Sequence, residues 1–144
     1  MKKIFFLISF AVGLFASGQV LAQCGDELLD ICYSKIGDYK YIKSYPIRIK
    51  KSRKGEPPIV AKYAVVLNGG VKYKIVGCNA SDMEGKVVIS LYNGDSMIGA
   101  TYDYNTGKEY PGIEFECKKS GVYYLSFYFR DGKEGCAICI LAQK

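Results

Sequence analysis

Hydrophobic and polar residues alternate along most of the chain beyond Tyr39, with a repeat of two positions. The alternation is clearest between residues 122 and 129. Because successive side chains of a β-strand point to opposite faces, one set of alternate positions in this segment should face a core. That set is Tyr123, Leu125, Phe127 and Phe129.

Turn residues separate the alternating segments and return about every 8 to 12 positions, a spacing typical of a β-sandwich or barrel. Asn-Gly, Ser-Gly and Asp-Gly pairs at these breaks tolerate the positive φ that tight turns need. The pattern predicts about eight strands whose apolar faces form a sandwich core. The predicted strands cover residues 41–50, 60–67, 71–78, 86–92, 97–102, 112–117, 122–129 and 136–141.

One short helix is expected before the strands, within residues 25–36. Leu28, Cys32 and Ile36 recur there at helical spacing. Two acidic residues begin the segment, where the helix dipole favours negative charge. The expected fold is therefore all-β, with one short N-terminal helix.

The first 22 residues have the organisation of a secretory signal. Two lysines begin it, an apolar run follows over residues 4–16, and a small-residue cleavage site ends at Ala22. Cleavage there leaves residues 23–144 as a single domain, which carries 18 basic and 14 acidic residues. We therefore expect a mildly basic protein in the periplasm or outside the cell, with no transmembrane segment after cleavage.

The predicted mature domain contains all six cysteines of the chain: Cys24, Cys32, Cys78, Cys117, Cys136 and Cys139. An even count in an exported domain predicts disulfides, so we expect three bridges and no free thiol. Cys136 and Cys139 form a C-x-x-C, but in a strand they would lie about 10 Å apart and could not bridge each other. Lipidation of Cys24 is a disfavoured alternative, because Gln23 stands where a small residue is expected.

From Tyr63 onward, short apolar alternations surround glycine turns. They are Tyr63-x-Val65-x-Leu67, Gly70-x-x-Tyr73-x-Ile75, Val87-x-Ile89-x-Leu91-Tyr92, Ile113-x-Phe115-x-Cys117 and Ser120-Gly121-x-Tyr123-Tyr124-Leu125. In this pattern the chain resembles the bacterial pre-peptidase C-terminal domain and related small secreted β-sandwiches. The resemblance implies a jelly-roll-like antiparallel sandwich that is non-catalytic and in some members binds polymers. The chain departs from that pattern in its cysteines, its N-terminal helix and the lack of an attached peptidase.

A jelly-roll order places the third predicted strand antiparallel to the eighth. On that order, Cys78 is expected to bridge Cys136 or Cys139. A tight hairpin at Asn68-Gly69 would instead change the strand order.

Catalytic chemistry finds little support in the sequence. The chain has no histidine, which excludes Ser-His-Asp and Cys-His catalysis and zinc sites that need imidazole. Glu114 and Glu116 would lie about 6.6 Å apart on one strand face, but Lys118 shares that face, as on a solvated surface. Residues 103–107 begin like a calcium loop but lack the later bidentate glutamate, so a turn explains them better. We predict no enzymatic activity, no cofactor and no metal.

Two surface features are candidates for binding. Tyr124, Tyr128 and Arg130 alternate with the predicted core set and should share the outward face of one strand. The two rings would lie about 13 Å apart, and the arginine would offer a planar fork to a carboxylate. Alternatively, the N-terminal helix packs over this face and buries both rings. A basic loop is the second feature, and a solvated surface loop is the simpler explanation of it. It comprises Arg48, Lys50, Lys51, Arg53 and Lys54.

These observations favour an exported, non-catalytic binding or interaction module. A glycan or peptide of the cell envelope or extracellular space is the expected ligand, because tyrosine rings suit both. Export argues against nucleic acid as a partner of the basic loop. The alternative is a small envelope-acting enzyme or inhibitor that uses carboxylates.

Overall fold

The computed structural model describes residues 24–144, so the predicted signal lies outside the described residues. A helix, α1 (Asp26–Tyr33), continues into a short 3₁₀ turn, η2 (Ser34–Ile36), and a second 3₁₀ turn is η3 (Arg130–Gly132). The strands are β1 (Lys40–Ile49), β2 (Ala61–Leu67), β3 (Lys72–Asn79), β4 (Val87–Asn93), β5 (Ser96–Ala100), β6 (Tyr102–Asp103), β7 (Lys108–Glu109), β8 (Gly112–Glu116), β9 (Gly121–Phe129) and β10 (Gly135–Gln143).

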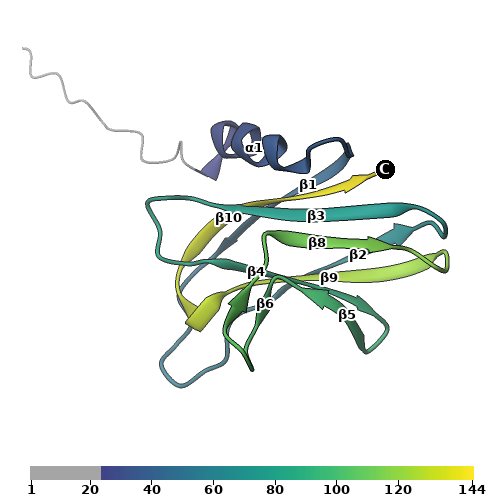
Figure 1. Cartoon of the computed structure of the whole chain (residues 1–144). Coiled ribbons are helices and arrows are strands. Elements are labelled where there is room, and N and C mark those ends of the chain that lie inside the picture. Colours follow the sequence, from purple (N-terminus) through teal and green to yellow (C-terminus); the bar gives the residue numbers. More distant parts are fainter. Residues whose placement is uncertain (1–23) are drawn as a thin grey trace, which may run out of the picture.

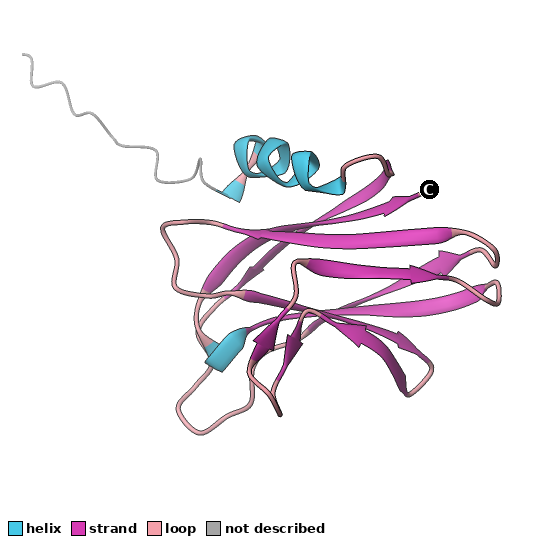
Figure 2. Ribbon diagram, viewed as in Figure 1, coloured by secondary structure: helices cyan, strands magenta, loops and turns pink. Residues whose placement is uncertain are grey.

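Eight of these strands form two four-stranded antiparallel sheets that face each other (Figures 1 and 2). The first sheet has the order β1-β10-β3-β8 and the second has the order β2-β9-β4-β5. The short strands β6 and β7 pair as a separate hairpin. The predicted all-β sandwich with one short helix is confirmed, and so is the antiparallel pairing of the third predicted strand, β3, with the eighth, β10.

The core between the sheets is built from the residues that the alternation places inward. Leu125, Phe127 and Phe129 of β9 are fully buried, and Tyr123 is almost so. In the register of the second sheet, Tyr63 of β2 stands opposite Leu125, and its ring packs against Phe127. The predicted core set of residues 122–129 is therefore confirmed.

Strand β10 is buried on both faces, which explains its nearly continuous apolar sequence. Its core face meets the second sheet, and its outer face lies under α1. Leu28 and Cys32 of α1 and Ile36 of η2 make the buried side of this segment. Ile138 and Ile140 of β10 belong to the same buried cluster. The helix thus covers the first sheet (Figure 1). The alternative that it covers the outward face of β9, which belongs to the second sheet, is wrong.

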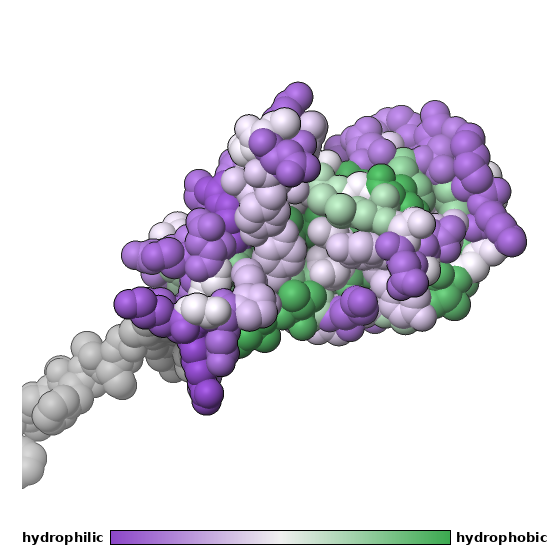
Figure 3. Space-filling view, turned by 90° about the horizontal axis from the view of Figure 1, so that it is seen from below, coloured by the Kyte–Doolittle hydropathy of each residue, from purple (hydrophilic) through white to green (hydrophobic). Residues whose placement is uncertain are grey.

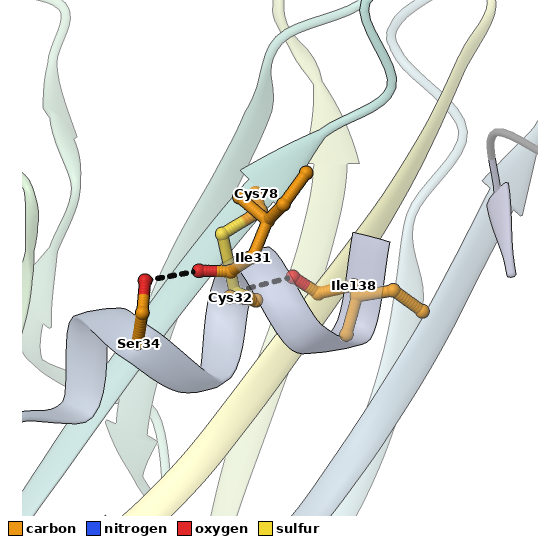
Figure 4. The surroundings of a disulfide bond; sticks show 5 residues. All are labelled: Ile31, Cys32, Ser34, Cys78 and Ile138. Atoms are coloured by element: carbon orange, nitrogen blue, oxygen red, sulfur yellow. Dashed lines mark hydrogen bonds between the residues drawn. A yellow bond between two sulfur atoms is a disulfide. The ribbon is translucent and has the colours of Figure 1, made fainter. Parts of the chain in front are cut away.

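Two disulfides tie the N-terminal segment to the first sheet. Cys24 bonds to Cys136 with their Cα atoms 5.8 Å apart, and Cys32 bonds to Cys78 with their Cα atoms 5.5 Å apart. Figure 4 shows the second bond reaching from α1 to β3, and the Cys32 sulfur also lies 3.3 Å from the carbonyl oxygen of Ile138. Because the Cys24 sulfur is in a disulfide, it is not available to carry a lipid.

The cysteine predictions are wrong in two respects. Cys117 and Cys139 are buried and unpaired, so two bridges form rather than three. Cys78 does not form a disulfide with β10, because the residue opposite it on that strand is Ile138. Cys78 bonds to Cys32 of α1 instead, and Cys136 bonds to Cys24, just before the helix. Cys139 points into the core whereas Cys136 points toward the helix, since the two lie an odd number of positions apart on one strand.

Candidate functional site

The outer face of the second sheet carries Tyr124 and Tyr128, and its part around β2 and the beginning of β9 is open to solvent. Tyr92 of β4 stands opposite Tyr124 of β9, and Ala64 of β2 flanks Tyr124 on its other side. Tyr124 is 37% exposed. Figure 3 views the molecule from below this sheet and shows pale and green surface, of weakly polar and apolar residues, with purple residues around it. We call this surface the tyrosine face.

A row of small side chains crosses the strands next to this pair of tyrosines. Ser126 of β9 stands opposite Ser90 of β4, which in turn stands opposite Ala100 of β5. Ser90 and Ser126 are only 3% and 5% exposed, because larger side chains rise on both sides of them.

Tyr128 lies beyond this row and is half-buried, unlike Tyr124. The ring of Tyr104, from the β6–β7 hairpin, stacks on it with centroids 6.4 Å apart and an interplanar angle of 15°. Burial first, and then a hydrogen bond with Tyr104, raises the pKa of the Tyr128 hydroxyl well above its usual value. Tyr102 meets Tyr104 edge-on with centroids 4.7 Å apart. The hairpin, which the sequence did not predict, thus covers one of the two predicted rings.

Arg130 follows β9 in the η3 turn, and its guanidinium is engaged within the chain. It forms an ion pair with Glu109 of β7 and lies 4.8 Å from the centroid of the Tyr102 ring. The Arg130 guanidinium was expected to bind a carboxylate of a ligand. It binds the Glu109 carboxylate of the protein instead. Arg130 holds the hairpin against η3.

Lys62 of β2 is a part of the tyrosine face that sequence reasoning missed. Its ammonium lies 5.9 Å from the ring centroids of both Tyr92 and Tyr124. The three residues come from three strands, and only the pairing of β2 and β4 with β9 brings them together. Alternation along β2 placed Lys62 outward, but nothing local indicated which strand would lie next to it.

Exposed apolar side chains border the tyrosine face. Val66 of β2 stands opposite Val122 of β9, and the two are 68% and 52% exposed. Met97 of β5 stands opposite Tyr92 and is 58% exposed. Neighbouring exposed apolar residues of this kind are typical of surfaces that contact another macromolecule.

The basic loop lies at the end of the sandwich near η3. All five of its predicted cationic residues are exposed, namely Arg48, Lys50, Lys51, Arg53 and Lys54. The backbone N–H of Ser52 donates to the carbonyl of Gly132 (2.9 Å), which fixes the loop beside η3. The structure thus brings the loop beside the turn that contains Arg130, although Arg130 and Lys54 are 76 residues apart in sequence.

The carboxylates weighed as catalytic or calcium-binding contact other groups of the chain. Glu114 pairs with Lys74 (3.2 Å), and Glu116 pairs with Lys118 (3.4 Å). The Asp103 carboxylate accepts a hydrogen bond from the N–H of Asn105 (2.8 Å), which lowers its pKa and closes the turn. Among residues 24–144, no group of three or more His, Cys, Asp or Glu side chains is placed to hold a metal ion. No helix of this part of the chain is long and apolar enough to cross a membrane.

Comparison with known proteins supports the fold and leaves the family open. No protein-family model matches the chain, and no curated protein matches it. Among solved structures, the chain is similar to PliG of Aeromonas hydrophila, described as a periplasmic lysozyme inhibitor of g-type lysozyme, with a TM-score of 0.52 and 11% sequence identity. The match covers 73% of this chain and 88% of PliG. At this identity the likeness shows a shared β-rich fold.

Proposed function

We propose that this chain is an exported, non-catalytic interaction module that binds a glycan or an extended peptide of the cell envelope through its tyrosine face. The observation that carries the proposal is that this face is open, whereas α1 covers the outer face of the other sheet. Core side chains fill the centre of the space between the sheets, so the outer faces and the edges of the sandwich are left for a ligand.

Export is supported by the disulfides. Disulfides such as Cys24–Cys136 and Cys32–Cys78 are typical of an oxidising compartment such as the periplasm or the extracellular space. PliG, a protein of similar fold, is described as periplasmic.

The chemistry of the tyrosine face suits a ligand that lies flat across strands. The rings of Tyr92 and Tyr124 offer apolar surfaces on which a sugar ring or an apolar side chain can stack. Ser90 and Ser126 are buried beside them, so a ligand would contact the rings rather than the serines. Lys62 contributes a cation whose three N–H groups can donate to ligand oxygens. This arrangement binds and orients a ligand without any group placed to break a bond in it.

The test replaces the two rings that form the accessible pair. We expect Tyr92→Ser/Tyr124→Ser to weaken binding of soluble peptidoglycan fragments, or of peptides cut from them, by about ten-fold or more, since each stacked ring contributes about 1 kcal/mol. Isothermal titration calorimetry measures the affinity. Tyr33→Ser on the exposed side of α1 is the matched control and should leave binding unchanged. Equal losses in both variants, or unchanged binding in the double variant, would reject the tyrosine face as the binding site.

A second candidate function is inhibition of a lysozyme. It is favoured by the shared fold with PliG and by the exposed apolar border of the tyrosine face, which suits a protein partner. Lysozyme activity on bacterial cell walls, followed by turbidity, should fall when the protein is added in equimolar amount. Val66→Glu/Val122→Glu should abolish that inhibition, because both side chains point to solvent from paired positions. Undiminished g-type lysozyme activity at ten-fold molar excess would exclude this candidate for that enzyme class.

A further inference from the structure

A cleft of about 660 Å³ opens along the side of the sandwich where β8 begins. Strands β3 and β8 form one wall, β4 forms the other, and the β6–β7 hairpin closes one end. The cleft exists because β8 begins part of the way along β3 (Figure 1). Strand β8 pairs only with residues 72–76, so residues 77–79 of β3 have a strand partner, β10, on one side only.

The backbone of this unpaired segment faces the cleft. In an antiparallel strand, alternate residues direct both backbone polar groups to the same side. Ala80 faces β10, because its N–H donates to the carbonyl of Cys136 (2.8 Å). Gly77 and Asn79 therefore direct their N–H and C=O groups to the opposite side. Continuing the register of β8 by one residue would bring Pro111 opposite Gly77, and proline has no N–H to donate.

The cleft is apolar within and cationic at its rim. Val87 and Ile89 of β4 line it from the core side. Lys74 is paired with Glu114, and Arg130 is paired with Glu109. Two further lysines, Lys35 and Lys86, line the cleft and are exposed. Neither forms an ion pair with another of residues 24–144. With four cations against two carboxylates, the lining has a net charge of +2.

We propose that an extended acidic segment of a partner protein binds in this cleft as an added strand along the free edge of β3. The open backbone groups recur at the spacing of a strand, which a peptide backbone matches and a small molecule does not. Alternate side chains of the added strand would face Val87 on the inside and Lys35 on the outside. The recognised segment therefore alternates apolar and acidic residues. This site does not involve Tyr92 or Tyr124, so it stands or falls separately from the proposed function.

The probe for this proposal is the hexapeptide acetyl-Val-Glu-Val-Glu-Val-Glu-amide, titrated into the isotopically labelled domain at up to millimolar concentration. We expect the largest amide shift changes in the nuclear magnetic resonance spectrum at Gly77 and Asn79. The same peptide with its alternate amides N-methylated should bind at least ten-fold more weakly, because it keeps the charges but loses the donors that face β3. Replacing its glutamates with glutamines should also weaken binding.

Charge variants of the protein complete the test. Lys35→Gln/Lys86→Gln should weaken binding about five-fold, since exposed ion pairs contribute modestly. The matched control Lys50→Gln/Lys51→Gln removes the same charge from the basic loop and should leave binding unchanged. If the methylated peptide binds as tightly as the unmethylated one, the attraction is electrostatic without strand addition, and the proposal is overturned. Amide shift changes confined to another surface, or no shift changes at all, would also overturn it. Tyr92→Ser/Tyr124→Ser should bind the probe normally, which separates this result from the test of the tyrosine face.

Discussion

Removing the disulfide between α1 and β3 should cost the protein a large part of its stability. The perturbation is the double variant Cys32→Ala/Cys78→Ala. The bond joins residues 46 positions apart. In the chain-entropy model, a cross-link that closes a loop of this length stabilises the folded state by about 4 kcal/mol at 25 °C. Since small domains are stable by about 5–15 kcal/mol in all, the variant should retain only about 1–11 kcal/mol of that stability.

The two unpaired cysteines provide the matched control for this prediction. Cys117→Ala/Cys139→Ala also removes two buried sulfur atoms but breaks no cross-link. Urea unfolding followed by circular dichroism should show the larger loss in the cross-link variant. In the cross-link variant, the free energy of unfolding should also fall more steeply with urea concentration, because the unfolded chain exposes more surface without the bond. Equal losses of stability in the two double variants would refute the cross-link as a main source of stability.

Three further outcomes are expected. Gly135→Ala should destabilise the domain by about 1–3 kcal/mol in thermal unfolding, because an added Cβ would overlap the ring of Phe129. Gly121 has open space around it, so the control Gly121→Ala should be nearly neutral. The raised pKa of Tyr128 means that the folded state holds this proton more tightly, so the stability that this group contributes is fully present below about pH 10 and is lost as the pH rises above it. Tyr128→Phe should flatten that fall in unfolding measured between pH 9 and 11, and an unchanged slope would contradict the assignment. Alkylation followed by mass spectrometry should label no cysteine in the native protein and two after denaturation without reductant, because both thiols are buried and burial raises the pKa of Cys139. Labelling of neither after denaturation would mean that a third disulfide exists.

The candidate site was predictable only in part. Alternation along β9 correctly placed Tyr124 outward, because the direction of a side chain follows from its position in the strand. It did not show that Tyr104 would cover Tyr128 or that Glu109 would engage Arg130. Both partners come from the β6–β7 hairpin, whose strands have two residues each and carry no detectable period of their own.

The sequence by itself determined the elements and their buried sides. A period of two over residues 122–129 required a core face, and the helical spacing of residues 25–36 required an apolar partner for the helix. Which surface would provide that partner was decided in three dimensions. Both sheets offered an outer face, and the helix lies on the first because β10 and β3 present apolar and cysteine side chains there.

The tertiary structure alone decided the cysteine pairing and the neighbours of each strand. Cys78 and β10 are adjacent as expected, yet the register sets Ile138 opposite Cys78 and brings Cys32 above it from the helix. Likewise, Lys62 meets two tyrosines only because β2 and β4 flank β9. The physical reason is that periodicity shows which side of the sheet a side chain points to. It does not show which strands pair, because the backbone groups that pair them are the same in every sequence. The choice of neighbour therefore depends on how all the buried faces pack together.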